Sequence, residues 1–221
     1  MEIRETIKEI KTQLRLSMNG IVSAHQRKQG LDYKINFGVE IPRLKALASN
    51  YQKDKQLAEA LWGENIRESK LLAIFLYPTE EFTTETAEKW IGECPFTEIA
   101  DHLSRNLLVS SWDAKEKALL RISASDNMKR YCGYSTLSNL FRTGTILDAE
   151  EEETYLKALK ETLYQPESSC SPTCNAAIIS LTKYTDENIE KAVDICNKIE
   201  KWDIEHNEVL KNLIKNIREE F

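Results

Sequence analysis

Asp101 and His102 are neighbouring residues whose side chains could carry acid–base chemistry. A carboxylate can stabilise a developing positive charge or activate a water molecule, and a histidine can act as a general base. No serine or cysteine nucleophile lies in a recognisable motif that His102 could serve. Asp101 also has a simpler interpretation, as an exposed or locally paired acid within a helix. The residue types therefore leave Asp101 as a candidate catalytic residue, with that structural role as the alternative.

Cationic side chains near the N-terminus form a candidate phosphate-contacting patch. The patch consists of Arg27, Lys28, Lys34, Arg43 and Lys45. A simple solvated surface is the alternative interpretation. The whole chain has a net charge of −6, which counts against DNA binding because phosphate contacts supply most non-specific affinity. An acidic chain can still present one basic face, so the net charge does not exclude a DNA-binding surface.

The cysteines predict a reducing environment. Their number is five, which is odd, and no secretory segment precedes them, so we expect reduced thiols in the cytoplasm. Cys170 and Cys174 lie four residues apart, but no histidine has a zinc-type spacing to them. We therefore expect neither a metal site nor a cofactor. No apolar run approaches the roughly 20 residues that span a membrane, so we expect no membrane partner.

These side chains must be positioned by helices. Apolar residues recur at steps of three and four, and the chain has only 7 Gly and 5 Pro, too few for a hairpin-rich fold. The spacing predicts about twelve helices, each of roughly 9–16 residues, in helix–turn–helix units that recur at about 35–45 residues. That period is typical of HEAT-type repeats, with a globular helical bundle as the alternative. The expected helices include 21–29, 40–51, 65–77, 96–110, 114–123, 127–142, 149–164, 173–184, 186–200 and 205–220. A first helix carries Ile3, Ile7, Ile10, Leu14 and Met18 on one stripe and is expected to end at Asn19-Gly20. The residues expected to cap or open the helices that follow them are Asp54, Thr83 or Thr84, Asp113, Ser125-Asp126 and Asp148.

Several other residues have structural interpretations. Arg67-Glu68 is expected to form an inter-helix ion pair or to bind a carbonyl group rather than to contact DNA. Trp62 and Trp90 lie on apolar stripes and are predicted to be in the core. Trp112 lies at a helix junction, where interhelical packing is favoured over an exposed ring.

One long segment resembles a known family. It comprises Tyr33-Lys34-Ile35-Asn36-Phe37-Gly38-Val39-Glu40-Ile41-Pro42, then Leu61-Trp62, then Asn65-Ile66-Arg67-Glu68-Ser69-Lys70-Leu71-Leu72-Ala73. This pattern resembles the AlkD-like DNA alkylation repair family, whose members are curved stacks of HEAT-like helix pairs. The resemblance implies an all-α HEAT-like repeat superhelix, an α-α solenoid, and one domain over residues 1–221.

The resemblance also places the family's chemistry on this chain. Asp101 falls at the family's acid position, whereas Thr97, Cys132 and Ile179 fall where the family has a Trp, an Arg and a second Trp. Arg130 is close to the Arg position in sequence but points about 160–200° away around the helix. The family's aromatic faces hold a cationic nucleotide by cation–π attraction, and its Arg binds phosphate through two hydrogen bonds. Thr and Ile provide no aromatic face for a cationic nucleotide, and Cys cannot bind phosphate through two hydrogen bonds.

We therefore interpret the chain as a DNA-associated protein related to alkylation-repair DNA glycosylases, with a degenerate catalytic site. It would bind duplex or branched DNA weakly, using the five N-terminal cationic residues and Arg130. One alternative is an active DNA glycosylase that excises cationic alkylpurines such as 3-methyladenine and 7-methylguanine, with Asp101 as its catalytic acid. A second alternative is a protein-binding helical scaffold, in which the acidic surface meets a partner protein.

Overall fold

Several of the described helices begin at a residue whose side chain caps the first turn. In the computed structural model, Asp54 accepts a hydrogen bond from the amide of Leu57 at 2.7 Å, and Asp126 accepts one from Lys129 at 2.8 Å. Thr83 caps its helix, and Asp148 forms a capping box with Glu151. These bonds satisfy amide groups that the helix itself leaves unpaired.

Two predicted helix boundaries differ from the structure. Asp113 makes no side-chain cap for the helix that follows it; its carboxylate lies 2.7 Å from Lys117 one turn later instead. The first helix ends at Leu16 rather than continuing to Met18, and Asn19 caps the second helix. The side chain of Asn19 accepts hydrogen bonds from the second and third amides beyond it, which makes it a start signal rather than a stop signal.

The structure describes residues 3–164, 171–187, 189–200, 202, 211, 212 and 215. Most of the predicted helix 205–220 lies outside these residues, as does Cys170. The chain divides into two units, Met1–Ser111 and Trp112–Phe221. That both belong to the single repeat domain expected from the sequence stays a prediction.

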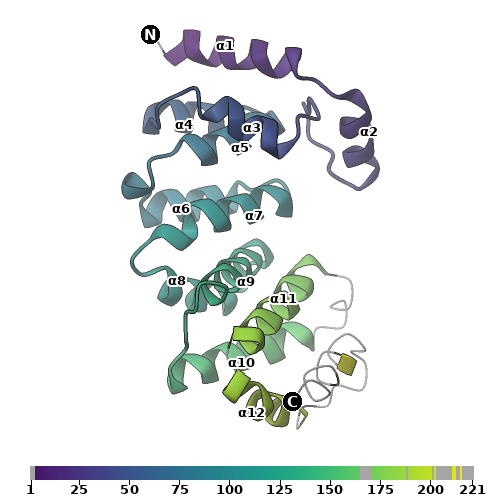
Figure 1. Ribbon diagram of the computed structural model, residues 1–221, viewed down its shortest axis with the longest axis vertical. Helices are drawn as coiled ribbons and strands as arrows, with labels where there is room; N and C mark the ends of the chain where they lie inside the picture. Colours follow the sequence, from purple (N-terminus) through teal and green to yellow (C-terminus); the bar gives the residue numbers. More distant parts are fainter. Residues whose placement is uncertain are drawn as a thin grey trace. The chain divides into compact units, whose positions relative to one another are not determined.

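Unit 1 is a stack of short helices (Figure 1). Within it α3, α5 and α7 are neighbours in space, and α4 packs against α5. The fifth helix is buried on nearly all sides, as its apolar sequence predicts. The elements of unit 1 are α1 (Ile3–Leu16), α2 (Gly20–Lys28), α3 (Ile41–Ala48), α4 (Lys55–Trp62), α5 (Arg67–Leu76), η1 (Thr79–Glu81), α6 (Thr84–Gly92), α7 (Thr97–Asn106) and η2 (Leu108–Ser110).

Unit 2 is built around α9, which packs against α8 and α11. Gly133 makes the contact with α8 possible, because a Cβ atom there would lie 2.8 Å from the backbone nitrogen of Ile122. The described elements of unit 2 are α8 (Ala114–Ile122), α9 (Asn127–Phe141), α10 (Ala149–Leu163), α11 (Pro172–Glu187) and α12 (Ile189–Glu200).

The protein has an all-α, HEAT-like repeat fold, which confirms the predicted fold class. Among the described residues there is no strand, only an isolated bridge between Ile35 and Ile66. No described helix combines the length and the apolar character needed to cross a membrane.

Tryptophan side chains test the predicted core. Trp62 and Trp90 are buried and stack with ring centroids 4.0 Å apart, which confirms their placement. The packing role predicted for Trp112 is wrong, since its side chain is 94% exposed. Trp112 lies between η2 and α8, outside both, so it stands on no helical stripe that would carry its ring into the core.

Candidate nucleic-acid interface

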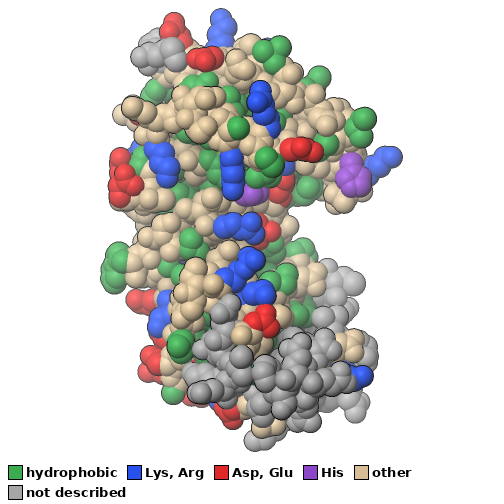
Figure 2. Space-filling view, in the orientation of Figure 1, with side chains coloured by type: hydrophobic (Ala, Val, Ile, Leu, Met, Phe, Trp, Pro, Cys, Tyr) green, Lys and Arg blue, Asp and Glu red, His purple; other side chains and the backbone are tan. Residues whose placement is uncertain are grey.

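A groove of about 330 Å³ lies on unit 1 where α3, α5 and α7 come together. Its polar lining includes Lys45, Lys53 and Asn106, and its aromatic lining is Tyr51 and Phe75. No acidic side chain lines it, whereas the other two described grooves include Glu9 or Glu152. In Figure 2, Lys and Arg side chains lie on the face of unit 1 over α3 and the helices below it. The groove therefore combines cations with aromatic rings in an otherwise acidic chain.

Both lysines of the groove are available to an anionic ligand. Lys45 and Lys53 are exposed, and neither forms an ion pair within the described part of the chain. The ammonium group of Lys45 lies 5.8 Å from the centre of the Phe75 ring, within the range of a cation–π contact. Such a contact orients the lysine without neutralising its charge.

His102 lies beside this groove on α7. Its ring packs edge-on against Phe75, with centroids 5.7 Å apart, and its Nδ1 atom is buried with no hydrogen-bond partner. Burial lowers the pKa of His102 below its ordinary value. The positive charges of Arg105 and Lys45 also lower it, whereas the negative charges of Glu98 and Asp101 raise it. The imidazole is therefore neutral at pH 7.

Asp101 precedes His102 on α7 and is half-buried. Its negative charge raises the pKa of His102, whereas the positive charge of Lys45 lowers it. The candidate acid thus lies on the helix that supplies His102 and Asn106 to the groove region. Thr97 lies four residues earlier, in the first turn of the same helix, and is also half-buried.

The two remaining marker positions lie in unit 2. Cys132 in α9 is 0% exposed, so this position cannot present a cation to a phosphate group. Ile179 in α11 is 54% exposed. Arg130 is half-buried and donates a hydrogen bond to the side chain of Asn127.

The other cationic residues singled out in the sequence occupy separate places in unit 1. Arg27 and Lys28 are exposed at the end of α2, and Lys34 is exposed in the loop before α3. Arg43 lines a second groove, between α1 and α3, together with Glu9. Of the N-terminal cationic residues, the structure brings Lys45 alone to the groove of α3, α5 and α7.

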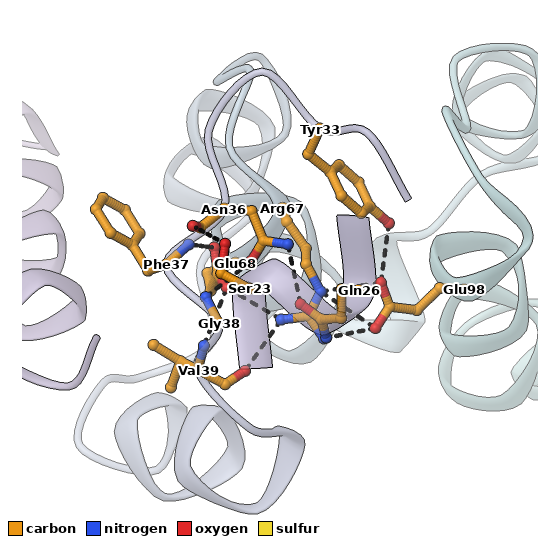
Figure 3. Close-up of polar contacts among 10 residues, drawn as sticks. All are labelled: Ser23, Gln26, Tyr33, Asn36, Phe37, Gly38, Val39, Arg67, Glu68 and Glu98. Atoms are coloured by element: carbon orange, nitrogen blue, oxygen red, sulfur yellow. Dashed lines mark hydrogen bonds and ion pairs between the residues drawn. The ribbon is translucent and has the colours of Figure 1, made fainter. Parts of the chain in front are cut away.

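A buried ion-pair network positions the elements around the groove (Figure 3). Glu68 is 0% exposed and accepts hydrogen bonds from the amides of Phe37, at 3.1 Å, and Val39, at 3.2 Å. Arg67 donates to the carbonyl of Val39 at 3.0 Å. The network confirms the structural role expected for Arg67-Glu68, since it ties the loop before α3 to the start of α5.

The same network reaches α7 through Glu98. The Arg67 guanidinium donates to both carboxylate oxygens of Glu98, and Tyr33 donates to Glu98 at 2.9 Å. Burial alone would raise the pKa of Glu98, but the hydrogen bonds and charge of Arg67 outweigh it and lower the pKa below its ordinary value. Burial and the Glu98 charge together raise the pKa of Tyr33. Glu98 is therefore a part-buried carboxylate committed to structure.

The groove contains residues that the sequence did not single out. Lys53, Phe75 and Asn106 come from three separate segments, and each is unremarkable in its own helix or loop. A weak signal exists at Phe75, which is an aromatic residue next to a buried apolar run. The convergence with Lys45 requires the packing of α3, α5 and α7.

Comparisons with known proteins agree with this fold. Residues 10–216 match the family model described as DNA alkylation repair enzyme. A solved structure is similar over 96% of this chain and 94% of its own, with a TM-score of 0.76 and 18% sequence identity. That protein is described as one of a new family related to the HEAT-like repeat DNA glycosylases with affinity for branched DNA structures. The comparison with curated proteins finds no match.

Proposed function

Because this chain belongs to the DNA alkylation repair enzyme family, we propose that it binds DNA through the groove of α3, α5 and α7. The observation that carries this proposal is the acid-free lining of the groove, with Lys45, Lys53 and Asn106 as polar groups. Cationic and amide side chains bind phosphate oxygens, and the aromatic rings of Tyr51 and Phe75 provide apolar surface beside them.

The reduced thiols of Cys94, Cys132, Cys174 and Cys196 support a cytoplasmic setting.

Branched DNA is the form of substrate that we propose. The support is the protein of similar fold that is described as having affinity for branched DNA. A branch point also differs from a duplex in a way that a small cationic surface can use, since it brings the phosphates of several strands close together. Two lysines then meet a higher density of negative charge than one duplex offers.

The proposed DNA binding is tested by titrating a three-way junction and a matched duplex with the wild-type protein. At about 50 mM salt we expect weak binding that falls steeply as salt rises, because it rests on phosphate neutralisation. Fluorescence anisotropy measures both affinities. If neither DNA is bound, the protein-binding scaffold becomes the better interpretation of the fold.

We further propose that the catalytic site is degenerate. Thr97 replaces an aromatic residue, and the buried Cys132 cannot replace an arginine in contacting phosphate. The aromatic and cationic groups with which the resembled family holds the nucleotide beside its acid are then missing, and misplacement of the nucleotide alone can cost many orders of magnitude in rate. The active-glycosylase alternative is favoured by one feature, which is the carboxylate of Asp101 on the helix beside the groove.

Little or no release of 7-methylguanine or 3-methyladenine from methylated DNA is therefore expected. Any residual release should be largely lost in Asp101→Asn, because the amide keeps the shape but loses the charge that stabilises a sugar cation. Chromatography of the released bases measures both. Efficient release by the wild type would show that the site is active. Release that survives Asp101→Asn would assign the acid to another residue.

A further inference from the structure

Large apolar side chains are exposed at the corner between α1 and α2. Leu16 is 77% exposed, Met18 63% and Ile21 85%. Single exposed hydrophobic residues are ordinary on protein surfaces, but three within six positions of the chain are a candidate interaction surface. We refer to Leu16, Met18 and Ile21 as the apolar corner.

The apolar corner lies in a cationic part of an acidic chain. No Asp or Glu occurs between Glu9 and Asp32, which is the longest acid-free stretch of the sequence. Arg15, Arg27 and Lys28 in this stretch are exposed, and Arg27 lies 3.9 Å from the exposed carboxylate of Asp32. In Figure 2, hydrophobic, histidine and cationic side chains appear together at the outer surface of α2. The charge around the corner is complementary to a polyanion.

The corner is held rigidly on unit 1. The amide of Asn19 donates to the carbonyl of Phe37 at 2.8 Å, and Ser23 donates to the carbonyl of Asn36 at 3.0 Å. Gly38 has φ +70°, and a Cβ atom there would lie 2.2 Å from the carbonyl oxygen of Asn19. Only glycine permits this approach.

The loop that holds the corner is also the loop bound by the ion-pair network. Phe37 and Val39 donate their amides to Glu68, and Asn36 bonds to Gln26 of α2 at 2.9 Å (Figure 3). The apolar corner and the groove of α3, α5 and α7 therefore belong to one hydrogen-bonded body. A ligand that spans both would meet a preformed surface.

We infer that the apolar corner is a wedge that contacts unstacked bases at the branch point of DNA. This inference rests on the proposed function and names the feature of the DNA that unit 1 recognises. Base stacking is interrupted at a branch point, which exposes apolar base faces, and proteins insert Leu, Ile and Met against such faces. Arg15 and Lys28 bind the flanking phosphates.

A protein partner fits this surface less well than DNA does. Three apolar side chains cover far less than the roughly 800 Å² that each side of a stable protein interface buries. Residues 10–31 also contain no acidic side chain that could pair with basic side chains of a partner protein, and Asp32 next to them lies 3.9 Å from Arg27. Both features suit branched DNA, which has densely spaced phosphates and exposes only a small apolar surface where its bases are unstacked.

The test is the variant Leu16→Ser, Met18→Ser, Ile21→Ser against a three-way junction and a matched duplex. We expect about a tenfold loss of affinity for the junction and no change for the duplex, because a wedge in an intact duplex must first unstack its base pairs. A 2-aminopurine at the branch point should change its fluorescence on binding the wild type and not the variant. Circular dichroism checks that the helices are retained, and the exposure of all three positions makes this the expected result.

The matched control is Leu120→Ser, Ile146→Ser, which removes exposed apolar side chains from unit 2 and should leave the junction preference unchanged. An unchanged junction preference in the corner variant would overturn the wedge while leaving DNA binding intact. An equal loss for junction and duplex would also overturn it, because the corner would then be a general DNA contact. Failure of the wild type to bind any DNA would overturn the proposed function and the wedge together.

Discussion

Arg67→Met is expected to lower the free energy of unfolding by about 3–5 kcal/mol, because it leaves the buried Glu68 and the part-buried Glu98 without their cation. The side chain of Arg67 is 1% exposed and bonds to Glu68, Glu98 and the carbonyl of Val39. Methionine fills part of the volume but donates no hydrogen bond. Urea unfolding followed by circular dichroism and tryptophan fluorescence measures the change.

The control is the same substitution at an exposed site on the neighbouring helix, Arg105→Met, which should change stability by less than about 0.5 kcal/mol. An equal effect of both variants would show that the network contributes little.

The pH dependence gives a second measurement of the same network. In the wild type the pKa of Glu98 is lowered by Arg67, so its contribution to stability is present above the unfolded pKa and is lost as the pH falls through the folded pKa. Without Arg67, burial raises the pKa of Glu98 instead, and protonation then relieves the unpaired charge. The stability difference between wild type and Arg67→Met should therefore shrink from pH 7 to about pH 4. A difference independent of pH would mean that lost packing, not charge, causes the effect.

Charge reversal in the groove, Lys45→Glu with Lys53→Glu, is expected to weaken binding to every form of DNA by about 100-fold at 50 mM salt. Both lysines are exposed and line the groove. Loss of two phosphate contacts should also reduce the slope of log affinity against log salt by about 2. The junction should lose at least as much affinity as the duplex, since the two lysines meet a higher density of phosphate charge at a branch point.

The matched control is Lys8→Glu with Lys89→Glu. These lysines are also exposed, neither lines the groove, and the change of net charge is the same. We expect a loss of affinity of less than about threefold, from long-range repulsion alone. Equal effects of the two double variants would place the binding surface outside the groove.

The sequence by itself determined the helices and much of their capping. Periodic apolar residues predict the helices because a helical stripe must be buried whatever its neighbour is. Asp54, Thr83, Asp126 and Asp148 act within a few residues of themselves, so their capping roles need no tertiary information. The structural role of Arg67-Glu68 was also predictable, since a charged pair that opens a buried apolar helix needs internal partners.

Local reasoning failed where two local outcomes compete. Asp113 precedes a helix and could cap it, but the Asp113 carboxylate instead forms an ion pair with Lys117 one turn later. Asn19 was predicted to end a helix, yet its side chain starts the next one. Trp112 was predicted to pack, but exposure depends on which surface the fold brings to it.

Only the tertiary structure decided the composition of the groove and the partners of the network. Glu98 follows Arg67 by 31 residues, and Lys45 and Asn106 come from helices with α5 between them. The sequence specifies each helix through neighbours three and four residues away. The convergence of side chains from different helices depends on how their buried faces interlock, which is a property of the packed layers and not of any single segment.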